Sequence, residues 1–209
     1  MLGYMYANGR GVAREGREAV RLFQLAAVQG HVEAEFNLGF IYANGLDVAI
    51  DDREAVRWYK LAAAKGHARA QCSLGIMYED GRSVAKDDNE AVKWYKLAAV
   101  QGYAAAQCNL GLMYEEGRGV ARDDREAVRW YDRAVAQSNA QAQCNLGIMY
   151  EDGRGVVQDE RKALKLYELA AAQGHEKAQY NVRRMYGRGT ILAKYRMMRQ
   201  GNSKLDLLL

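Results

Sequence analysis

Three cysteines occupy one repeating position, and thiols are the most chemically versatile side chains in this sequence. They are 36 residues apart, at Cys72, Cys108 and Cys144. If they lie on stacked helices, those helices are about 9 to 10 Å apart, whereas a disulfide needs Cα atoms within about 7 Å. No C-x-x-C pair and no cysteine-histidine cluster indicates a zinc site. We therefore predict free, half-buried thiols, no metal, no cofactor and a reducing compartment.

Histidine recurs at a second position, directly after a glycine, at His31, His67 and His175. Imidazole is a common general base and activates nucleophiles. No serine, cysteine or carboxylate is fixed directly beside these histidines. We interpret the position as surface or helix cap, and we predict no catalytic residue and no enzyme activity.

Asparagine recurs in the middle of a predicted helix, although it is a poor helix former. It directly precedes a recurring Leu-Gly pair or its equivalent, and Ser73 takes its place in the remaining repeat. The asparagines are Asn37, Asn109, Asn145 and Asn181. Two explanations stay open: each amide bonds to a neighbouring helix, or it faces a ligand. Apolar candidates for contact with the same ligand are Phe36, Phe40, Ile76, Leu112 and Ile148.

The elements that position these residues follow from a repeat of 36 residues. The Leu-Gly pair begins at Leu2, Leu38, Leu74, Leu110 and Leu146 without slippage. Each unit reads as a helix, a Gly-Val loop and a second helix, and the chain contains no proline. One hairpin cannot bury both apolar faces, so the units must stack into an all-α solenoid. The predicted units are 1–30 (partial), 31–66, 67–102, 103–138, 139–174 and 175–189 (partial), followed by a divergent basic cap or tail at 190–209.

Local signals support the hairpin. Gly75 inside a helix costs about 1 kcal/mol relative to alanine, so its place beside a leucine predicts close helix packing there. Asp87 and Glu90 have capping-box spacing at the start of the second helix, and the same spacing recurs in two other units. The column of Trp58, Trp94 and Trp130 sits at core spacing, which favours packing over a binding role.

The segment AQCNLGLMYEEGRGVARDDREAVRWYDRA, residues 106–134, resembles the Sel-one-like repeat (SLR) family, a relative of the tetratricopeptide repeat. The resemblance implies a right-handed superhelix of about five and a half repeats and a role as a protein-binding scaffold or adaptor. In the related tetratricopeptide proteins, an asparagine directly before the leucine lies on the concave side and binds ligand. Some family members are connected with β-lactam binding or hydrolysis. Because we predict no catalytic residue in this sequence, such an enzyme is the least favoured alternative here.

Charge bears on the remaining alternatives. The net charge is +4, but residues 183–209 carry seven basic residues and one acidic residue, so residues 1–182 have a net charge of −2. Nucleic acid is therefore not a favoured partner of the repeats, although the basic tail could bind it or another acidic surface. Glu79, Glu115 and Glu151 recur at first-helix ends, where we expect them to face the trough. We predict a protein or peptide partner, no membrane span, a cytoplasmic location, and open solenoid ends that allow self-association.

Overall fold

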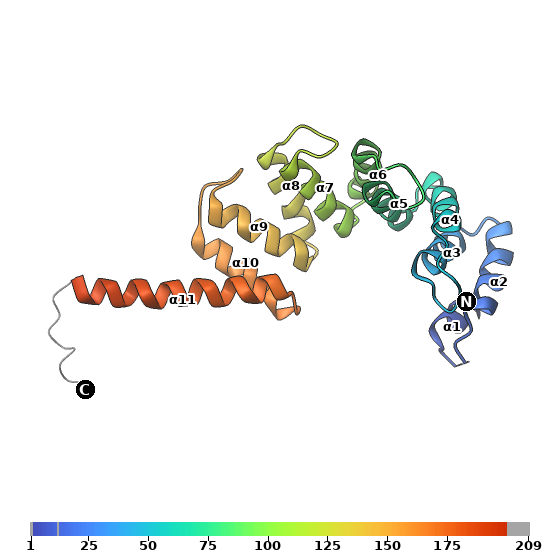
Figure 1. Ribbon diagram of the computed structural model, residues 1–209, viewed down its shortest axis with the longest axis horizontal. Helices are drawn as coiled ribbons and strands as arrows, with labels where there is room; N and C mark the ends of the chain where they lie inside the picture. The colour runs from blue at the N-terminus through green and yellow to red at the C-terminus, as the bar shows by residue number, and fades with distance from the viewer. Residues whose placement is uncertain (1, 12, 200–209) are drawn as a thin grey trace. The chain divides into compact units, whose positions relative to one another are not determined.

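The structure is a computed structural model that describes residues 2–11 and 13–199, with side chains described except at residues 8 and 188–199. Over these residues the chain is a series of sequential helix pairs (Figure 1). The first helices of the repeats are α1 (Leu2–Asn8), α3 (Val32–Asn44), α5 (Ala68–Asp80), α7 (Ala104–Glu116), α9 (Ala140–Asp152) and α11 (Glu176–Arg199). The second helices are α2 (Gly16–Val28), α4 (Asp52–Ala64), α6 (Asp88–Val100), α8 (Asp124–Val135) and α10 (Glu160–Ala172).

The predicted all-α fold of 36-residue hairpin repeats is confirmed. The helices form two compact units: the first is Met1–Ala134, and the second begins at Val135. In the first unit, α1, α3 and α5 each pack on their own second helix, and α2, α4 and α6 also pack against the next first helix. In the second unit, α10 packs against both α9 and α11. The right-handed sense of the superhelix stays a prediction.

The glycine of the Leu-Gly pair allows the two helices of a hairpin to approach closely. A Cβ added at Gly75 would lie 2.5 Å from Cε1 of Tyr95, which is fully buried on α6. The same contact recurs between Gly39 and Tyr59, again at 2.5 Å. The predicted close packing is therefore confirmed, and the partner is a tyrosine ring on the second helix.

The second helices α4, α6, α8 and α10 are capped by aspartates, as predicted for the first three, whereas the N-cap of α2 is Glu15. In α6 the predicted capping box is only half formed. The carboxylate of Asp87 accepts hydrogen bonds from the backbone N–H groups of Asn89 and Glu90. In a complete box, the glutamate would accept from the backbone N–H of Asp87. That N–H instead donates to the carbonyl of Tyr78 at 3.0 Å. The loop thus ties the start of the second helix to the end of the first.

Left-handed glycines end the first helices, and α11 is the exception. Gly81 caps α5 with φ 71°, as the sequence predicts, and Val84 in the following loop packs partly buried against the core. Gly189 occupies the equivalent place in the last repeat, yet α11 continues through it to Arg199. The predicted boundary between 189 and 190 therefore falls inside one helix.

The tryptophans pack as predicted but are not the centre of the core. Trp94 lies half-buried against a core cluster that contains Tyr59 of the preceding repeat and Leu74 of its own repeat. The centre is formed instead by the residue after each tryptophan or its equivalent. These residues, buried to 3% exposure or less, are Tyr59, Tyr95, Tyr131 and Tyr167.

Candidate functional site

Three cavities lie along the first helices of the first unit. Their volumes are about 460, 260 and 150 Å³. The two larger cavities share Tyr4, Phe23, Glu33 and Asn37, and the second shares Phe40 with the third. They therefore form one continuous depression over α1, α3 and α5. We call it the first-helix groove.

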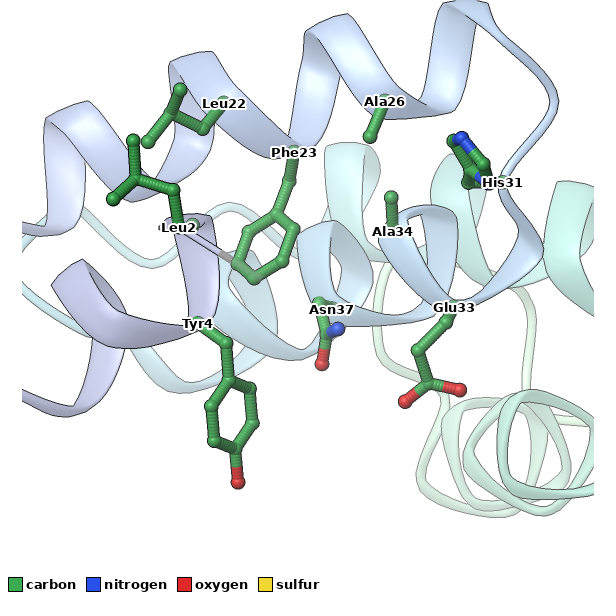
Figure 2. Close-up of a pocket in the computed structure, with 10 residues that line it drawn as sticks. Leu2, Tyr4, Leu22, Phe23, Ala26, His31, Glu33, Ala34 and Asn37 are labelled. Atoms are coloured by element: carbon green, nitrogen blue, oxygen red, sulfur yellow. The ribbon is translucent and has the colours of Figure 1, made fainter. Parts of the chain in front are cut away.

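Figure 2 shows the largest cavity of this groove. The ring of Phe23 reaches from α2 into a space bordered by Leu2 of α1 and Asn37 of α3. Tyr4 and Glu33 point to the side away from α2. The cavity thus has an apolar floor and polar groups at its edge, which is the usual composition of a binding pocket.

The predicted apolar contact residues differ in how far they are exposed to solvent. Phe40 and Ile76 remain 41% and 37% exposed on the groove. Phe36 is only 3% exposed: its ring stacks on His67 at 4.8 Å between centroids, and Arg69 lies 4.4 Å above it. Phe36 therefore acts mainly as a wall of the groove. Leu112, on α7 of the first unit, is half-buried, and so is Ile148, on α9 of the second unit.

The asparagines also fall into two groups. Asn37 is half-buried and lines two of the cavities, and Ser73 lines the third. Asn109 is half-buried, and its amide nitrogen lies 3.9 Å from the Sγ atom of Cys72 in the preceding repeat. In the second unit, Asn145 is 8% exposed and its amide oxygen accepts from Gln141 at 2.9 Å. Asn181 is also buried, at 6% exposure.

These positions make Asn37 the best-placed of the four amides to meet a ligand. Asn145 already has a polar partner on its own helix, and Asn109 makes a weak contact with sulfur. The four amides share a sequence position but not an environment, so a ligand role for all four stays a prediction.

The glutamates at the first-helix ends are engaged within the protein rather than free to face a ligand. Glu79 accepts a hydrogen bond of 2.5 Å from the phenol of Tyr95, and Arg118 of the next repeat also pairs with it. In the second unit, Glu151 accepts from Tyr167 at 2.9 Å and pairs with Arg184. These carboxylates join two helices of one repeat to the following one.

The thiols and imidazoles are in structural environments. The three cysteines are free and at most 4% exposed, more deeply buried than predicted. Burial raises the pKa of Cys72 to about 12, which disfavours the reactive thiolate. His67 caps α5, because its Nδ1 accepts from the backbone N–H of Ala70 and its Nε2 lies 2.9 Å from Glu33. His175 caps α11 in the same way.

The sequence analysis missed one candidate nucleophile. Ser83 and Lys86 have the Ser-x-x-Lys spacing of some β-lactam enzymes. The structure places both in the loop between α5 and α6, exposed to solvent, with φ 55° at Ser83. An exposed loop lacks the enclosed, water-excluding surroundings on which such catalysis depends. We assign no catalytic role to the pair.

Among residues 2–11 and 13–199, no group of three or more His, Cys, Asp or Glu side chains is arranged to hold a metal ion. No helix in the same residues is both long and apolar enough to cross a bilayer.

The stacked helical hairpins define the class of protein: an α-helical repeat protein with a groove along its first helices. More specifically, the chain belongs to the Sel1 repeat family, whose repeat matches at residues 1–31, 32–67, 68–103, 104–139 and 140–175. No curated protein matches the chain.

Solved structures agree with this assignment. A protective antigen present in uropathogenic Escherichia coli strains, which has an SLR fold, is 36% identical with a TM-score of 0.82. The match covers 90% of this chain but only 40% of that one, so this chain spans less than half of its length. A Sel1 repeat protein from Oxalobacter formigenes is 34% identical, with a TM-score of 0.82, over 87% of this chain and 72% of that one. An immunity protein from Pseudomonas aeruginosa has the same fold at 23% identity and a TM-score of 0.58, over 85% and 68% of the two chains.

Proposed function

We propose that this protein is a scaffold or adaptor that binds a peptide segment of a partner protein along the first-helix groove. The observation that carries the proposal is the continuity of three cavities over α1, α3 and α5. Repeats of this kind typically mediate protein interactions, and the groove gives that general role a particular surface.

The chemistry of the groove suits a peptide. Exposed Tyr4, Phe40 and Ile76 provide apolar and aromatic contacts, which commonly dominate binding energies at protein interfaces. Asn37 has both an amide donor and an acceptor for a peptide backbone. Glu33 and Arg69 stand at the edge with opposite charges and form a long ion pair of 3.9 Å between Arg69 Nη1 and Glu33 Oε1. This combination resembles an apolar interface centre with a polar rim.

The second helices offer a competing surface. Leu25, Leu61 and Leu97 repeat every 36 residues and are 53%, 41% and 47% exposed. A regular row of exposed leucines also suits a partner protein. None of the three leucines lines a cavity of the first-helix groove, so we favour the groove and use the leucines as a matched control.

A peptide library displayed on phage and selected on the full chain tests the proposal. We expect selected peptides to lose about 2 kcal/mol of binding energy when Phe40 and Ile76 are both replaced by alanine. Binding should persist in the Leu61→Ala, Leu97→Ala variant, because those leucines lie on the other helices. The contrary pattern, loss only with the leucine variant, would move the binding surface to the second helices.

Asn37→Ala extends the same experiment. We expect it to weaken selected peptides by about 1 kcal/mol without lowering the thermal midpoint. A lower midpoint with unchanged affinity would show that the amide braces the helices.

Binding of acidic surfaces by the basic tail and self-association at the solenoid ends remain secondary proposals, as does the cytoplasmic location. The side chains of 188–199 and all of 200–209 lie outside the described part of the chain.

A further inference from the structure

One set of three positions links neighbouring repeats in the first unit. Between α5 and α7, it consists of Glu79, Tyr95 and Arg118. The carboxylate of Glu79 is the common acceptor: the phenol donates to one oxygen at 2.5 Å, and the guanidinium pairs with the other. The phenol of Tyr95 is fully buried and has Glu79 as its acceptor, whereas the guanidinium of Arg118, whose side chain is 29% exposed, also pairs with Glu116.

The same positions one repeat earlier hold Ala43, Tyr59 and Arg82. Both donors are therefore present, but alanine replaces the acceptor. Two repeats earlier the positions hold Ala7, Phe23 and Leu46, so acceptor and donors are all absent there. The middle set is the odd one, with two donors arranged around a missing carboxylate.

The arginine of this set has substitute partners. Arg82 donates to the backbone oxygen of Ala43 at 3.0 Å and pairs with Asp52 at 2.5 Å. Tyr59, which is 3% exposed, lines the same cavity as Ser73. In the complete set the guanidinium goes to Glu79 instead. Asp88, the equivalent of Asp52, then keeps one buried carboxylate oxygen without a hydrogen-bond partner among the described residues. The arginine thus selects the first-helix carboxylate when one is present.

A cavity of about 150 Å³ occupies the place of the missing carboxylate. Its lining includes Ala43, Tyr59 and Arg82, together with Phe40, Ser73 and Ile76. Four heavy atoms distinguish glutamate from alanine. At the roughly 30 Å³ that one water occupies in the liquid, the cavity has room for them. The cavity is also the last part of the first-helix groove, through its shared residue Phe40.

We propose that this cavity, the carboxylate pocket, binds a glutamate side chain of the peptide that occupies the groove. The proposal rests on the proposed function for its ligand, while the pocket itself is defined by the comparison of repeats. The glutamate would accept from the Tyr59 phenol and the Arg82 guanidinium, as Glu79 does from their equivalents. Charge-assisted hydrogen bonds of this kind are about twice as strong as neutral ones.

The competing partner of Arg82 limits the affinity and supplies a sharp variant. Asp52 must release at least part of the guanidinium when the ligand arrives. Asp52→Asn weakens that competition and lowers the local negative charge, so it should tighten carboxylate binding about threefold to tenfold. Helix α4 should persist in this variant, because its N-cap is Asp51 rather than Asp52.

Nuclear magnetic resonance of the full chain can test the pocket with N-acetyl-L-glutamic acid α-amide, whose only carboxylate is on the side chain. We expect chemical-shift changes at the methyl groups of Ala43, Ile76 and Met77 that saturate with a millimolar dissociation constant. The uncharged N-acetyl-L-glutamine α-amide should bind about tenfold more weakly. Equal binding of the two probes would overturn the proposal, because the pocket would then be recognising only the shared apolar and amide groups.

Two variants complete the test. Ala43→Glu supplies the carboxylate from within the chain and should abolish the shifts, with circular dichroism confirming the fold. Glu79→Ala vacates the complete set and should create a second site that shifts Leu112 and Met113. The carboxylate pocket is refuted if the Glu79→Ala variant binds the probe near Leu112 and Met113 while the wild-type protein shows no binding near Ala43.

The selected peptides separate this proposal from the function on which it rests. One contrary result would be selected peptides that need Phe40 and Ile76 for binding and yet bind equally well after Ala43→Glu or after a Glu→Gln change in the peptide. That result would support the groove and refute the pocket. Saturable probe binding by the wild type that Ala43→Glu abolishes would support the pocket even if the phage selection placed peptides on the second helices.

Discussion

Two neighbouring junctions of the first unit are built on one plan and differ in one group. Between α5 and α7, the carboxylate of Glu79 joins Tyr95 to Arg118. Between α3 and α5, Ala43 replaces the glutamate, and a cavity of about 150 Å³ lies between Tyr59 and Arg82. One junction is closed by its own chain, and the other offers the same donors to a ligand.

The difference shows how a repeat protein can gain a site without changing its fold. The helix lengths, the left-handed glycine C-caps and the glycine–tyrosine contacts are alike at the two junctions. Hydrogen-bonding positions can therefore vary within a constant packing framework, since each repeat contacts mainly its neighbours. Binding specificity can then arise where one member of a polar set is omitted.

The largest effect should come from opening the closed junction. Glu79→Ala leaves the Tyr95 phenol buried without its acceptor and removes one of the two carboxylates that pair with Arg118. We expect a loss of about 2 to 3 kcal/mol in the free energy of unfolding, measured by urea denaturation. Glu90→Ala, which removes a surface pair with Lys93, is the control and should cost less than about 1 kcal/mol. Equal losses from the two variants would show that the junction network adds nothing beyond surface charge.

A pair of glycine variants sharpens the comparison. An alanine Cβ at Gly39 or Gly75 would lie 2.5 Å from a tyrosine ring in either case. Tyr95 is held at its far end by Glu79, whereas Tyr59 borders the cavity and can shift. We expect Gly75→Ala to cost about 2 kcal/mol and Gly39→Ala about 1 kcal/mol less, by urea denaturation.

Gly187→Ala is the control for both, because its added Cβ would have no described heavy atom within 4 Å apart from its chain neighbours and its own helix backbone. It should stabilise α11 by up to about 1 kcal/mol. A larger cost for Gly39→Ala than for Gly75→Ala would contradict the idea that the cavity gives Tyr59 room to move.

Periodicity predicted the helices, the glycine packing and the aspartate caps, because each depends on residues near one another in sequence or on a regular repeat. The return half of the capping box was wrong for a physical reason. The backbone N–H of Asp87 is satisfied by the carbonyl of Tyr78 across the loop, so Glu90 is not needed there. Residue spacing alone does not reveal that competing acceptor.

The candidate site was predicted less completely. Phe40 and Ile76 were placed on the correct helices, but equal repeat positions did not mean equal exposure, as Asn37 and Asn145 show. The carboxylate set was missed, although a signal for it exists in the sequence. Positions 7, 23 and 46 are all apolar, whereas positions 79, 95 and 118 are all polar. Their contact became evident only from the structure, because two of the positions lie on different helices and the third lies in the loop of the next repeat.

Restoring the missing carboxylate tests the central claim most directly. Ala43→Glu and Ala43→Gln add side chains of nearly equal size and helix propensity, so their difference isolates the charge. Urea denaturation of the full chain should find the glutamate variant about 1 kcal/mol more stable than the glutamine variant, because only the carboxylate makes charge-assisted bonds with Arg82 and Tyr59. Equal stability, or a more stable glutamine variant, would contradict the account of the α3–α5 junction as a set that lacks one carboxylate.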